Sequence, residues 1–403
     1  MKILLVSQYF YPEEFKINEL AETLVSKGHD VTVLTGKPNY PTGEYYDGYS
    51  FKGVMYEEYK GAKVIRVPLI KRRKGRAINL VLNYLSFVYY ANKYISKHEI
   101  KADAIICFEI SPITQAFPCI KCQKHYGGKI LLWVQDLWPE SVTAAGGIKN
   151  IFALSILNKM VKRIYDKCDV LMVQSLAFRD SILAKGDFKN KIQYMPNWAD
   201  SIFTNDGNID LNKYKSLMPD GFKVMFAGNI GFAQDFDAII KAAVLTKDTP
   251  EIKYVIVGDG RARENAERQV SELGLEKSFV FLGRYPVVEM PNMFVHADVM
   301  LVSLKNDHIF SLTIPSKIQC YMASGKPIVT MIDGIGNEIV KDANCGITAN
   351  AGDYRKLAEN IKLMYLKTRE NLKMMGDNAA SYYKSHFDKD TVIESMLKTI
   401  ETL

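Results

Sequence analysis

The segment "TIPSK", residues 313–317, places a lysine at the expected start of a helix. Pro315 suits the first turn of a helix, and the hydroxyl groups of Thr313 and Ser316 are suited to capping it. Lys317 falls in that first turn, where its positive charge opposes the helix dipole and is mildly destabilising. The lysine is favourable there when it shares a bound anion with the helix amides. The segment therefore predicts an anion site, and a solvated lysine is the alternative.

Glycines follow three strand-like segments in the C-terminal half of the chain. They are Gly228 after "FKVMFA", Gly258 after "IKYVIV" and Gly283 at the end of "FVFLG". A glycine at a strand end lets the backbone approach a ligand, and the helix that follows offers its N-terminal amides to an anion. Three such turns predict a bound nucleotide or phosphate. Neither a GxGxxG fingerprint nor a GxxxxGK[ST] loop is present, which argues against an NAD enzyme and a P-loop ATPase.

Strand-like and helix-like patterns alternate along the 403 residues. Short Val/Ile/Leu runs without polar alternation are typical of parallel strands covered on both faces. We predict a doubly wound α/β domain over residues 1–200 and a second one over 201–385, divided by the polar stretch 198–221. The terminal helix, about 386–403, is expected to pack back on the first domain. Two such domains bind ligands in a cleft, beyond the carboxyl ends of their strands.

Metal ligands are sparse in this sequence. Cys119, Cys122 and His125 have a suggestive spacing, but a zinc site needs a fourth ligand and usually a second pair, and neither is nearby. We expect buried thiols in a reducing cytoplasm and no metal site. The opening "MKILLVSQYF" is too short and too soon interrupted for a signal peptide, which also favours the cytoplasm.

The basic residues of the chain are concentrated in its first half. Residues 1–200 carry 28 Lys/Arg and 19 Asp/Glu, whereas residues 201–403 carry 24 and 26. Within residues 71–97, an aromatic and apolar helical pattern follows a basic run: Lys71, Arg72, Arg73, Lys74 and Arg76. It predicts an interfacial helix with its basic residues on anionic headgroups, and a buried core helix after a solvated loop is the alternative. Nucleic acid is not expected, because no reading element accompanies the patch.

A family resemblance is carried by motifs in this order: "KGHDVTVLTG", "DLWPES", "PNWAD", "FAGNIG", "VGDG", "FLGRYP" and "PSKIQCYMASGKPIV". Together they resemble the retaining glycosyltransferases of family 4, which have the GT-B fold of two Rossmann-like domains. The match covers nearly the whole chain. Within the family, "SQYFYPEEFKINELAETL" and "GKPNYPTGEYYDGY" are similar to the bacterial capsule and O-antigen branch, and above all to L-fucosaminyltransferases.

The resemblance implies a reaction and its partners. An N-acetylated 6-deoxy sugar, N-acetyl-L-fucosamine, would pass from its UDP donor to an undecaprenyl-diphosphate-linked sugar, with no cofactor and no metal. The enzyme would then be cytoplasmic and peripherally bound to the anionic inner face of the plasma membrane. The leaving phosphate takes the acceptor proton in the mechanism proposed for the family, so a protein base is unnecessary.

The resemblance also implies donor contacts in the C-terminal domain. The base would lie against Gly283, Arg284 and Tyr285. Relatives hold the diphosphate with an arginine and a lysine, at places that are occupied here by Asn229 and Gln234.

Two further family contacts have no counterpart in this chain. Relatives use two glutamates for the sugar and the ribose, and the matching positions here are Leu312 and Cys320. We therefore expect the diphosphate to meet Lys317 and Arg284, because the leaving UDP needs positive charge. Arg261 and Arg263 are further candidates, and Glu338 is the expected ribose contact.

On the acceptor side, two carboxylates stand at strand ends. Asp136 ends the strand in "WVQDLWPES", and Glu109 ends the one in "CFEISP". Each is expected either to contact the donor sugar or acceptor hydroxyl, or simply to cap a helix. The loop after the first strand is expected near the donor diphosphate, through Phe15, Lys16 and Asn18.

Two other functions remain open at this point. A GT-B-fold UDP-sugar 2-epimerase would share the donor site but ignore membranes. A non-catalytic nucleotide-sugar-binding protein would give no product with any acceptor.

Overall fold

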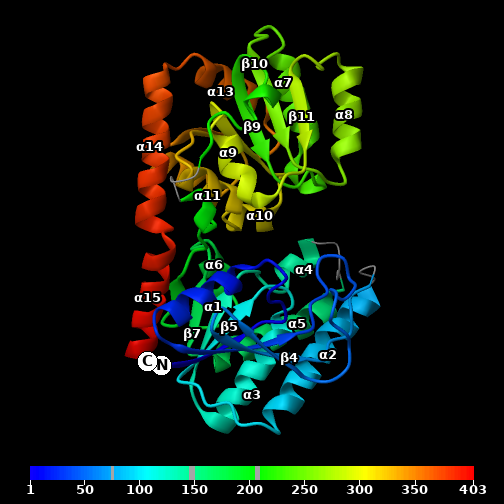
Figure 1. The fold of residues 1–403 in the computed structure, drawn as a ribbon, viewed down its shortest axis with the longest axis vertical. Coiled ribbons are helices and arrows are strands. Elements are labelled where there is room, and N and C mark those ends of the chain that lie inside the picture. Colours follow the sequence, from blue (N-terminus) through cyan, green and yellow to red (C-terminus); the bar gives the residue numbers. More distant parts are fainter. Residues whose placement is uncertain (74–76, 145–149, 205–208) are drawn as a thin grey trace. The chain divides into compact units, whose positions relative to one another are not determined.

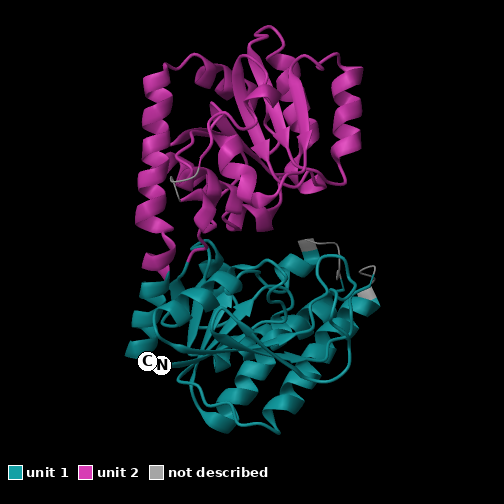
Figure 2. Ribbon diagram, in the orientation of Figure 1, with its two compact units in different colours: residues 1–195, 393–403 teal, residues 196–392 magenta. Residues whose placement is uncertain are grey.

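The computed structural model describes residues 1–73, 77–144, 150–204 and 209–403. The chain divides into two compact units, which Figure 2 colours separately: unit 1 comprises residues 1–195 and 393–403, and unit 2 comprises residues 196–392. Each unit is a mainly parallel sheet flanked by helices (Figure 1). The predicted class, two doubly wound Rossmann-like domains, is confirmed. Lys74 and Arg76 of the basic run lie outside the described residues.

The sheet of unit 1 has the strand order β3-β4-β2-β1-β5-β6-β7-β8. Its strands are β1 Lys2–Val6, β2 Asp30–Gly36, β3 Met55–Tyr59, β4 Ala62–Val67, β5 Ala104–Glu109, β6 Lys129–Val134, β7 Val170–Val173 and β8 Ile192–Tyr194. All neighbours are parallel except β3, which pairs antiparallel with β4. The two strands are joined by Lys60 and Gly61, which both have positive φ, as a two-residue hairpin turn requires.

The helices of unit 1 are α1 Lys16–Ser26, α2 Ala77–Ile95, α3 Ala116–Tyr126, α4 Glu140–Ala144, α5 Ile151–Lys167 and α6 Phe178–Leu183. The crossovers through α2, α3 and α5 advance in one direction across the sheet, whereas the crossover through α1 runs the other way. Because parallel crossovers are right-handed, α2, α3 and α5 cover one face and α1 covers the other. The N-terminal ends of these helices lie at the carboxyl edge of the sheet, where the strands end.

The sheet of unit 2 has the order β11-β10-β9-β12-β13-β14, and all its neighbours are parallel. Its strands are β9 Phe222–Ala227, β10 Ile252–Val257, β11 Phe279–Gly283, β12 Val299–Ser303, β13 Ile328–Met331 and β14 Gly346–Ala349. The chain order runs outward in one direction from β9 and in the other from β12. The carboxyl ends of β9 and β12 therefore mark a topological switch point, where ligands of open α/β sheets bind.

The helices of unit 2 are α7 Phe236–Leu245, α8 Arg263–Glu272, α9 Met290–Phe294, α10 His308–Leu312, α11 Ser316–Ala323, α12 Ile335–Asp342, α13 Tyr354–Tyr365 and α14 Arg369–His386. The last helix, α15 Lys389–Thr402, begins in unit 2, and its residues from Ile393 onward belong to unit 1. There, Glu394 accepts a 3.1 Å hydrogen bond from Lys27, and the Thr399 hydroxyl accepts a hydrogen bond from the side-chain amide of Gln193.

The strands of unit 2 bury alternate residues in two separate clusters. On β9, Val224 and Phe226 join one cluster, and Met225 and Ala227 join the other. A strand that is apolar on both faces reads as a continuous hydrophobic run, which explains why the sequence predicts it well. Full burial of one such side chain contributes about 1.5–3 kcal/mol. This packing fixes where β9 ends and so positions the Gly228 turn.

Candidate active site

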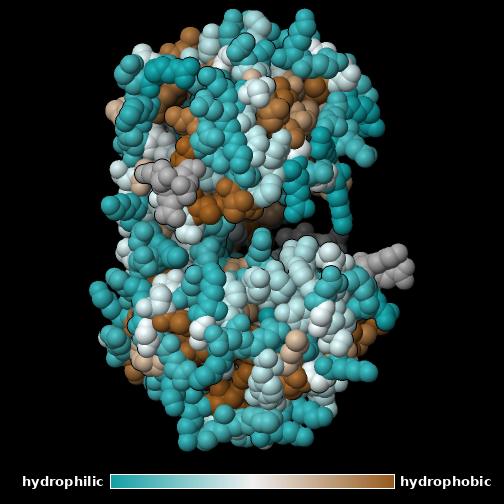
Figure 3. Space-filling model, in the orientation of Figure 1, coloured by the Kyte–Doolittle hydropathy of each residue, from teal (hydrophilic) through white to brown (hydrophobic). Residues whose placement is uncertain are grey.

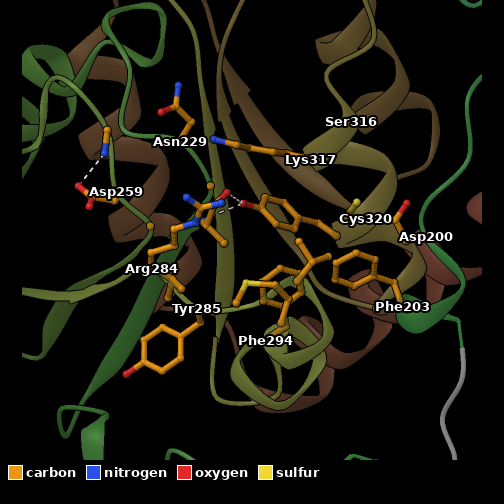
Figure 4. Close-up of a pocket in the computed structure, with 18 of the residues that line it drawn as sticks. Asp200, Phe203, Asn229, Asp259, Arg284, Tyr285, Phe294, Ser316, Lys317 and Cys320 are labelled. Atoms are coloured by element: carbon orange, nitrogen blue, oxygen red, sulfur yellow. Dashed lines mark hydrogen bonds between the residues drawn. The ribbon is translucent and has the colours of Figure 1, made fainter. Parts of the chain in front are cut away.

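A cavity of about 940 Å³ lies in unit 2 at the switch point (Figure 4). Its wall combines three kinds of group that suit a nucleotide. Close backbone comes from Gly228, Gly258 and Gly260, positive charge from Arg261, Arg284 and Lys317, and aromatic surface from Phe203, Tyr285, Phe294 and Tyr321. The structure thus brings together eight of the predicted donor residues, since Asn229 and Ser316 also line it.

The glycine turns are too tightly packed to accept a side chain. Gly228 has φ +132°, and a Cβ there would lie 2.8 Å from Cε of Lys317. Gly258 has φ +143°, and its Cβ would lie 1.9 Å from the carbonyl oxygen of Gly228. Only glycine accommodates both the conformation and the contact. The cavity is therefore lined by backbone at the ends of β9 and β10, which leaves room for phosphate.

Lys317 extends across this cavity with its ammonium group toward Asn229 (Figure 4). Its Nζ donates a 2.8 Å hydrogen bond to Oε1 of Gln234 and lies 3.5 Å from the centroid of the Phe226 ring. None of the described carboxylates forms an ion pair with it. Desolvation by burial lowers the pKa of Lys317 to about 7. The side chain is still partly exposed, and it lines the cavity. An anion in the cavity would supply the missing counter-charge.

The first turn of α11 has no side-chain cap. Pro315 is itself the N-cap residue, and the Thr313 hydroxyl donates to the carbonyl of Ile309 at the end of α10. The expected capping by Thr313 and Ser316 is therefore wrong, because Thr313 is the C-cap residue of α10 and Ser316 is already the first residue of α11. The first-turn amides of α11 accordingly remain suited to an anion beside Lys317.

The arginine candidates differ in their placement. Arg284 and Arg261 line the cavity, and Figure 4 shows the Arg284 guanidinium directed into it. Arg263 is paired within its own helix, where Nε donates to Glu267 at 2.8 Å. The geometry thus favours Arg284 and Arg261 as phosphate contacts.

Besides Arg263, several predicted donor residues of unit 2 do not line the cavity. Gln234 is one of them, and its Oε1 accepts the hydrogen bond of Lys317. Gly283 supports the cavity wall indirectly, because its carbonyl accepts a 2.7 Å hydrogen bond from the amide of Gly258, which lines the cavity. Thr313 and Pro315 shape the entry to α11. Glu338 is exposed on α12 and is not among the lining residues, so the geometry offers no support for the expected ribose contact.

The sequence analysis missed Asp200, a carboxylate that lines the cavity. Figure 4 shows its side chain next to that of Cys320. The available signal was the motif "PNWAD", which ends at Asp200 and follows the last strand of the first sheet. Asp200 was overlooked because it is 120 positions from Cys320 in the sequence, and only the fold brings the two together.

In unit 1, Asp136 is partly exposed at the carboxyl edge of the sheet. Its Oδ2 accepts hydrogen bonds from the amide of Ser111 at 2.9 Å and from the Ser111 hydroxyl at 2.8 Å. That hydroxyl in turn accepts from Nε1 of Trp138 at 3.1 Å. The carboxylate is thus fixed by the neighbouring strand loop rather than by the first turn of α4, and its orientation is set before any ligand arrives.

Glu109 lies behind Asp136 and is fully buried. Neither of its carboxyl oxygens has a hydrogen-bond partner in the described structure. Burial, together with the nearby Asp136 carboxylate, raises the pKa of Glu109 well above its usual range. The buried side chain is out of reach of a substrate, so the geometry does not support its expected contact with substrate.

The loop residues Phe15, Lys16 and Asn18 belong to unit 1, and as donor contacts they stay a prediction. Phe15 packs against the rings of Tyr9 and Tyr40, and Lys16 pairs with Glu19 at 3.7 Å. The Asn18 amide is already engaged in the loop: it accepts from the Tyr11 amide and donates to the Glu13 carbonyl. Asn18 therefore supports the shape of the loop through both ends of its amide.

The basic run 71–76 is largely folded onto unit 1 where it is described. Lys71 forms an ion pair with Glu44, and Arg72 lies against the rings of Tyr9 and Tyr40. Arg73 is exposed, while its amide donates to the Gly43 carbonyl at 2.8 Å. Two of the predicted headgroup contacts are thus engaged with protein groups.

The helix that follows exposes an apolar stripe. Its members are Ile78, Val81, Leu82, Leu85 and Tyr89, which share one side of α2. Figure 3 shows apolar surface on the side of unit 1 where α2 runs. On α5, which covers the same sheet face, Ile151, Phe152 and Ile156 are exposed as well, Phe152 by 82%. None of the helices among the described residues is long and apolar enough to cross a bilayer.

Metal binding finds no support in the described part of the chain. Within it, no three His, Cys, Asp or Glu side chains are grouped so that they could hold a metal ion. The positive charge of the cavity comes from its own Lys317, Arg284 and Arg261.

Comparisons with known proteins agree with this architecture. The model of the family "Glycosyltransferase Family 4" matches residues 17–201, and that of "Glycosyl transferases group 1" matches residues 209–382. A protein of Escherichia coli K12 described as a colanic acid biosynthesis glycosyl transferase, WcaI, is 23% identical over 99% of this chain and 100% of its own length.

Two solved structures show the same fold. Sucrose-phosphate synthase from Thermosynechococcus elongatus superposes with a TM-score of 0.75 at 15% identity, over 100% of this chain and 98% of its own. HepE from Anabaena, solved in complex with UDP and glucose, gives 0.68 at 16% identity over the full length of both chains.

Proposed function

The chain is a family 4 glycosyltransferase with the GT-B fold, and from that premise we propose its reaction. It transfers an N-acetylated 6-deoxy sugar, N-acetyl-L-fucosamine, from UDP to an undecaprenyl-diphosphate-linked sugar. The observation that carries this proposal is Lys317, a buried ammonium without a carboxylate partner in the described structure, in a cavity lined by glycine backbone. Such a cation is costly to bury unless an anion joins it.

The donor diphosphate occupies the space between Lys317, Arg284 and the first-turn amides of α11. Breaking the bond between the sugar and the phosphate builds negative charge on the leaving UDP. Preplaced cations and amides stabilise that charge most strongly in an enclosed site. Because this chain supplies the charge itself, we propose that transfer needs no metal ion.

The nucleoside half lies toward the aromatic side of the cavity. Tyr285 and Arg284 follow β11 and border the base. Asp200 accepts hydrogen bonds from the ribose hydroxyls and replaces the carboxylate that this chain lacks at Cys320. The adjacency of Asp200 and Cys320 supports this assignment (Figure 4).

The acceptor meets unit 1, where Asp136 contacts a hydroxyl of the donor sugar or the acceptor. A bond forms between the acceptor oxygen and the anomeric carbon as the bond from that carbon to the donor phosphate breaks. The acceptor proton passes to an oxygen of the leaving phosphate on the same face. The anomeric configuration is thereby retained.

The setting of the reaction is capsule or O-antigen synthesis at the cytoplasmic face of the plasma membrane. The name of the similar WcaI refers to the synthesis of colanic acid, also a polysaccharide. The exposed apolar residues of α2 and α5, together with the basic first half of the chain, support peripheral contact with an anionic bilayer.

The deciding experiment incubates the protein with UDP-N-acetyl-L-fucosamine and a prenyl-diphosphate-linked sugar. Transfer predicts release of UDP that requires the lipid acceptor, with product of the same anomeric configuration as the donor. An epimerised UDP-sugar formed without acceptor would establish the epimerase instead. Tight UDP binding without turnover of any donor and acceptor pair would leave a nucleotide-sugar-binding protein.

A further inference from the structure

Arg72 is held in a fixed position after β4 in unit 1. Its guanidinium carbon lies 5.2 Å from the ring centroid of Tyr40 and 5.8 Å from that of Tyr9. Nη1 donates to the Tyr9 hydroxyl at 3.3 Å, and the backbone amide donates to Oδ1 of Asn39 at 3.1 Å. Contacts with two aromatic rings and one side-chain hydrogen bond restrain a side chain that is normally flexible, and the bond to Asn39 fixes the backbone beneath it.

The groups that hold Arg72 are themselves restrained. Tyr9 is 2% exposed, and Asn39 is fully buried. The rings of Tyr9, Phe15 and Tyr40 pack together, with centroids 5.4 to 5.8 Å apart. The position of the guanidinium is therefore set by the packed loops at the carboxyl edge of the sheet, before any ligand binds.

Arg72 has no carboxylate partner among the described residues, unlike Lys71 and Arg66. Lys71 pairs with Glu44, and Arg66 pairs with Glu57. The buried acid of the same loop cluster, Glu13, already accepts from the backbone amides of Asn39, Tyr40 and Phe10. A partly buried guanidinium with most of its five N–H donors unused is a preformed site for an anion.

This cation stands on the acceptor side of the site. Tyr84 of α2 is within electrostatic reach of both Arg72 and Asp136, although its raised pKa is caused mainly by burial. The two charged groups therefore flank one tyrosine at the carboxyl edge of unit 1. An acceptor whose hydroxyl meets Asp136 would place its other groups toward Arg72.

We propose that Arg72 binds a diphosphate group of the acceptor through its planar fork of N–H donors. Guanidinium binds phosphate oxygens in pairs, which fixes orientation as well as charge. The inference rests on the proposed function and names the acceptor's diphosphate as the occupant of this site. It assigns Arg72 a different role from the headgroup contact expected from the basic run.

The direct test measures binding of geranyl diphosphate, a water-soluble prenyl diphosphate, after the donor site has been saturated with UDP. Calorimetry is expected to show at least 10-fold weaker binding to Arg72→Met than to the parent protein. Lys71→Met, which removes a neighbouring cation already paired with Glu44, is the matched control and is expected to change binding less than 2-fold. Equal binding to the parent protein and to Arg72→Met would overturn the proposal.

A second variant covers the risk that Arg72→Met disturbs the loops. Arg72→Lys keeps the charge and the aliphatic stem but loses the planar fork. It is expected to weaken binding 3-fold or more, while its thermal unfolding and UDP affinity match the parent protein. Full affinity in Arg72→Lys would show that a simple charge suffices and would contradict the bidentate site.

Vesicles separate the acceptor diphosphate from lipid headgroups, which share its chemistry. Sedimentation with phosphatidylglycerol vesicles that contain no acceptor is expected to be the same for Arg72→Met and the parent protein. Loss of vesicle binding with unchanged geranyl diphosphate binding would identify a headgroup contact and sink the inference.

Kinetics separate this inference from the proposed function itself. With the lipid diphosphate acceptor, Arg72→Met is expected to raise the acceptor KM at least 10-fold and to leave the donor KM unchanged. With the same sugar as an alkyl glycoside, the two proteins are expected to have equal kcat/KM. If no acceptor supports transfer but geranyl diphosphate still binds through Arg72, the site stands and the proposed reaction fails.

Discussion

At the scale of single residues, Lys317 is a group whose placement favours function over stability. Its folded-state pKa of about 7 lies below the ordinary value of 10.5. Between these values the unfolded chain binds more protons, so stability rises with pH across this window, and Lys317 is destabilising below it. A bound diphosphate reverses this balance, because it supplies the charge that burial removed.

Replacing Lys317 is therefore expected to separate activity from stability. Lys317→Met should lower turnover at least 10²-fold, about 3 kcal/mol of lost transition-state stabilisation. The same variant, free of ligand at pH 7, should unfold at a higher temperature, by roughly 2 °C or more.

The matched control is Lys326, a half-buried lysine whose ammonium donates to the carbonyls of Val295 and Ala297 at 3.1 Å. Lys326→Met should leave turnover nearly unchanged, since Lys326 does not line the cavity. Near-normal turnover in Lys317→Met would remove Lys317 from the diphosphate site.

The pH dependence of UDP binding follows from the same lysine. UDP favours protonated Lys317, so its affinity should fall as the pH rises from about 6 to 9, through a pKa near 7 in the free protein. Calorimetry in buffers of different ionisation enthalpy should show proton uptake on binding at pH 8. A Lys317→Met protein that kept the full pH dependence of the parent would contradict this origin.

Asp200 is expected to determine affinity for the ribose. Asp200→Asn should raise the donor KM roughly 10-fold, the loss of one or two charge-assisted hydrogen bonds. It should also reduce the preference for UDP over 2′-deoxy-UDP in competition assays. Glu338→Gln is the control, because Glu338 does not line the cavity. A larger effect from Glu338→Gln than from Asp200→Asn would restore the original expectation.

The sequence identifies some of these residues and not others, for physical reasons. Lys317 and the glycines stand out because each violates a local preference, of a helix start or of ordinary backbone conformation. The bond from Lys317 to Gln234 joins residues 83 positions apart, and no local pattern records it. Asp200 was missed for the same reason. It lines the same cavity as Cys320, and only the fold shows that a carboxylate from a distant loop could take the place of one at position 320.

At the scale of elements, α2 buries one side and exposes apolar residues on the other. Phe87 and Ala91 are fully buried, whereas Leu82 and Leu85 are exposed. The helix carries no acidic residue over its length. α5 also exposes apolar residues at its start, and three exposed basic residues follow further along: Lys159, Lys162 and Arg163. Such surfaces suit an anionic bilayer better than a second basic copy of the chain.

Vesicle binding should depend on these helices. Leu82→Asp in α2 and Phe152→Asp in α5 should each weaken sedimentation with phosphatidylglycerol vesicles about 10-fold, since one inserted side chain contributes about 1.5–3 kcal/mol. Leu366→Asp, at an exposed leucine of unit 2, is the control and should bind as the parent protein does. Unchanged binding of both helix variants would refute the interfacial surface.

The strands show which elements the sequence reveals. Central strands such as β5 are buried at every residue and are read directly from their apolar runs. β3 was not predicted, because "MYEEY" is an edge strand with alternating exposure and two glutamates. β14 was also missed, since only one of its four residues is fully buried. Low burial alone does not hide a strand, however, because β11 has only one buried residue and its run "FVFLG" is still recognised by its apolar side chains.

At the scale of the whole molecule, unit 1 is built from two distant parts of the chain. Ile393, Met396 and Ile400 are buried, and they belong to unit 1 although unit 2 lies between them and the rest of it in sequence. The core of unit 1 is therefore incomplete without residues 393–403.

Removing residues 393–403 should affect the two units differently. The truncated chain should lose stability in unit 1, seen as a separate unfolding transition at lower temperature and faster amide exchange in β1 and β8. UDP should still bind unit 2 within about 2-fold of the parent affinity. Concerted loss of UDP binding and of the unit 1 fold would show that the units depend on each other.

The return of α15 to unit 1 also sets an order of events on the ribosome. Residues 1–195 are synthesised first, yet their remaining partner appears only after about 200 further residues, roughly 10–40 s later at ordinary elongation rates. Throughout that interval the nascent first unit lacks Ile393, Met396 and Ile400, so we expect the apolar residues that they cover to be open to a chaperone or a neighbouring chain. Synthesis of residues 393–403 thus completes the first unit only after the second unit has been made.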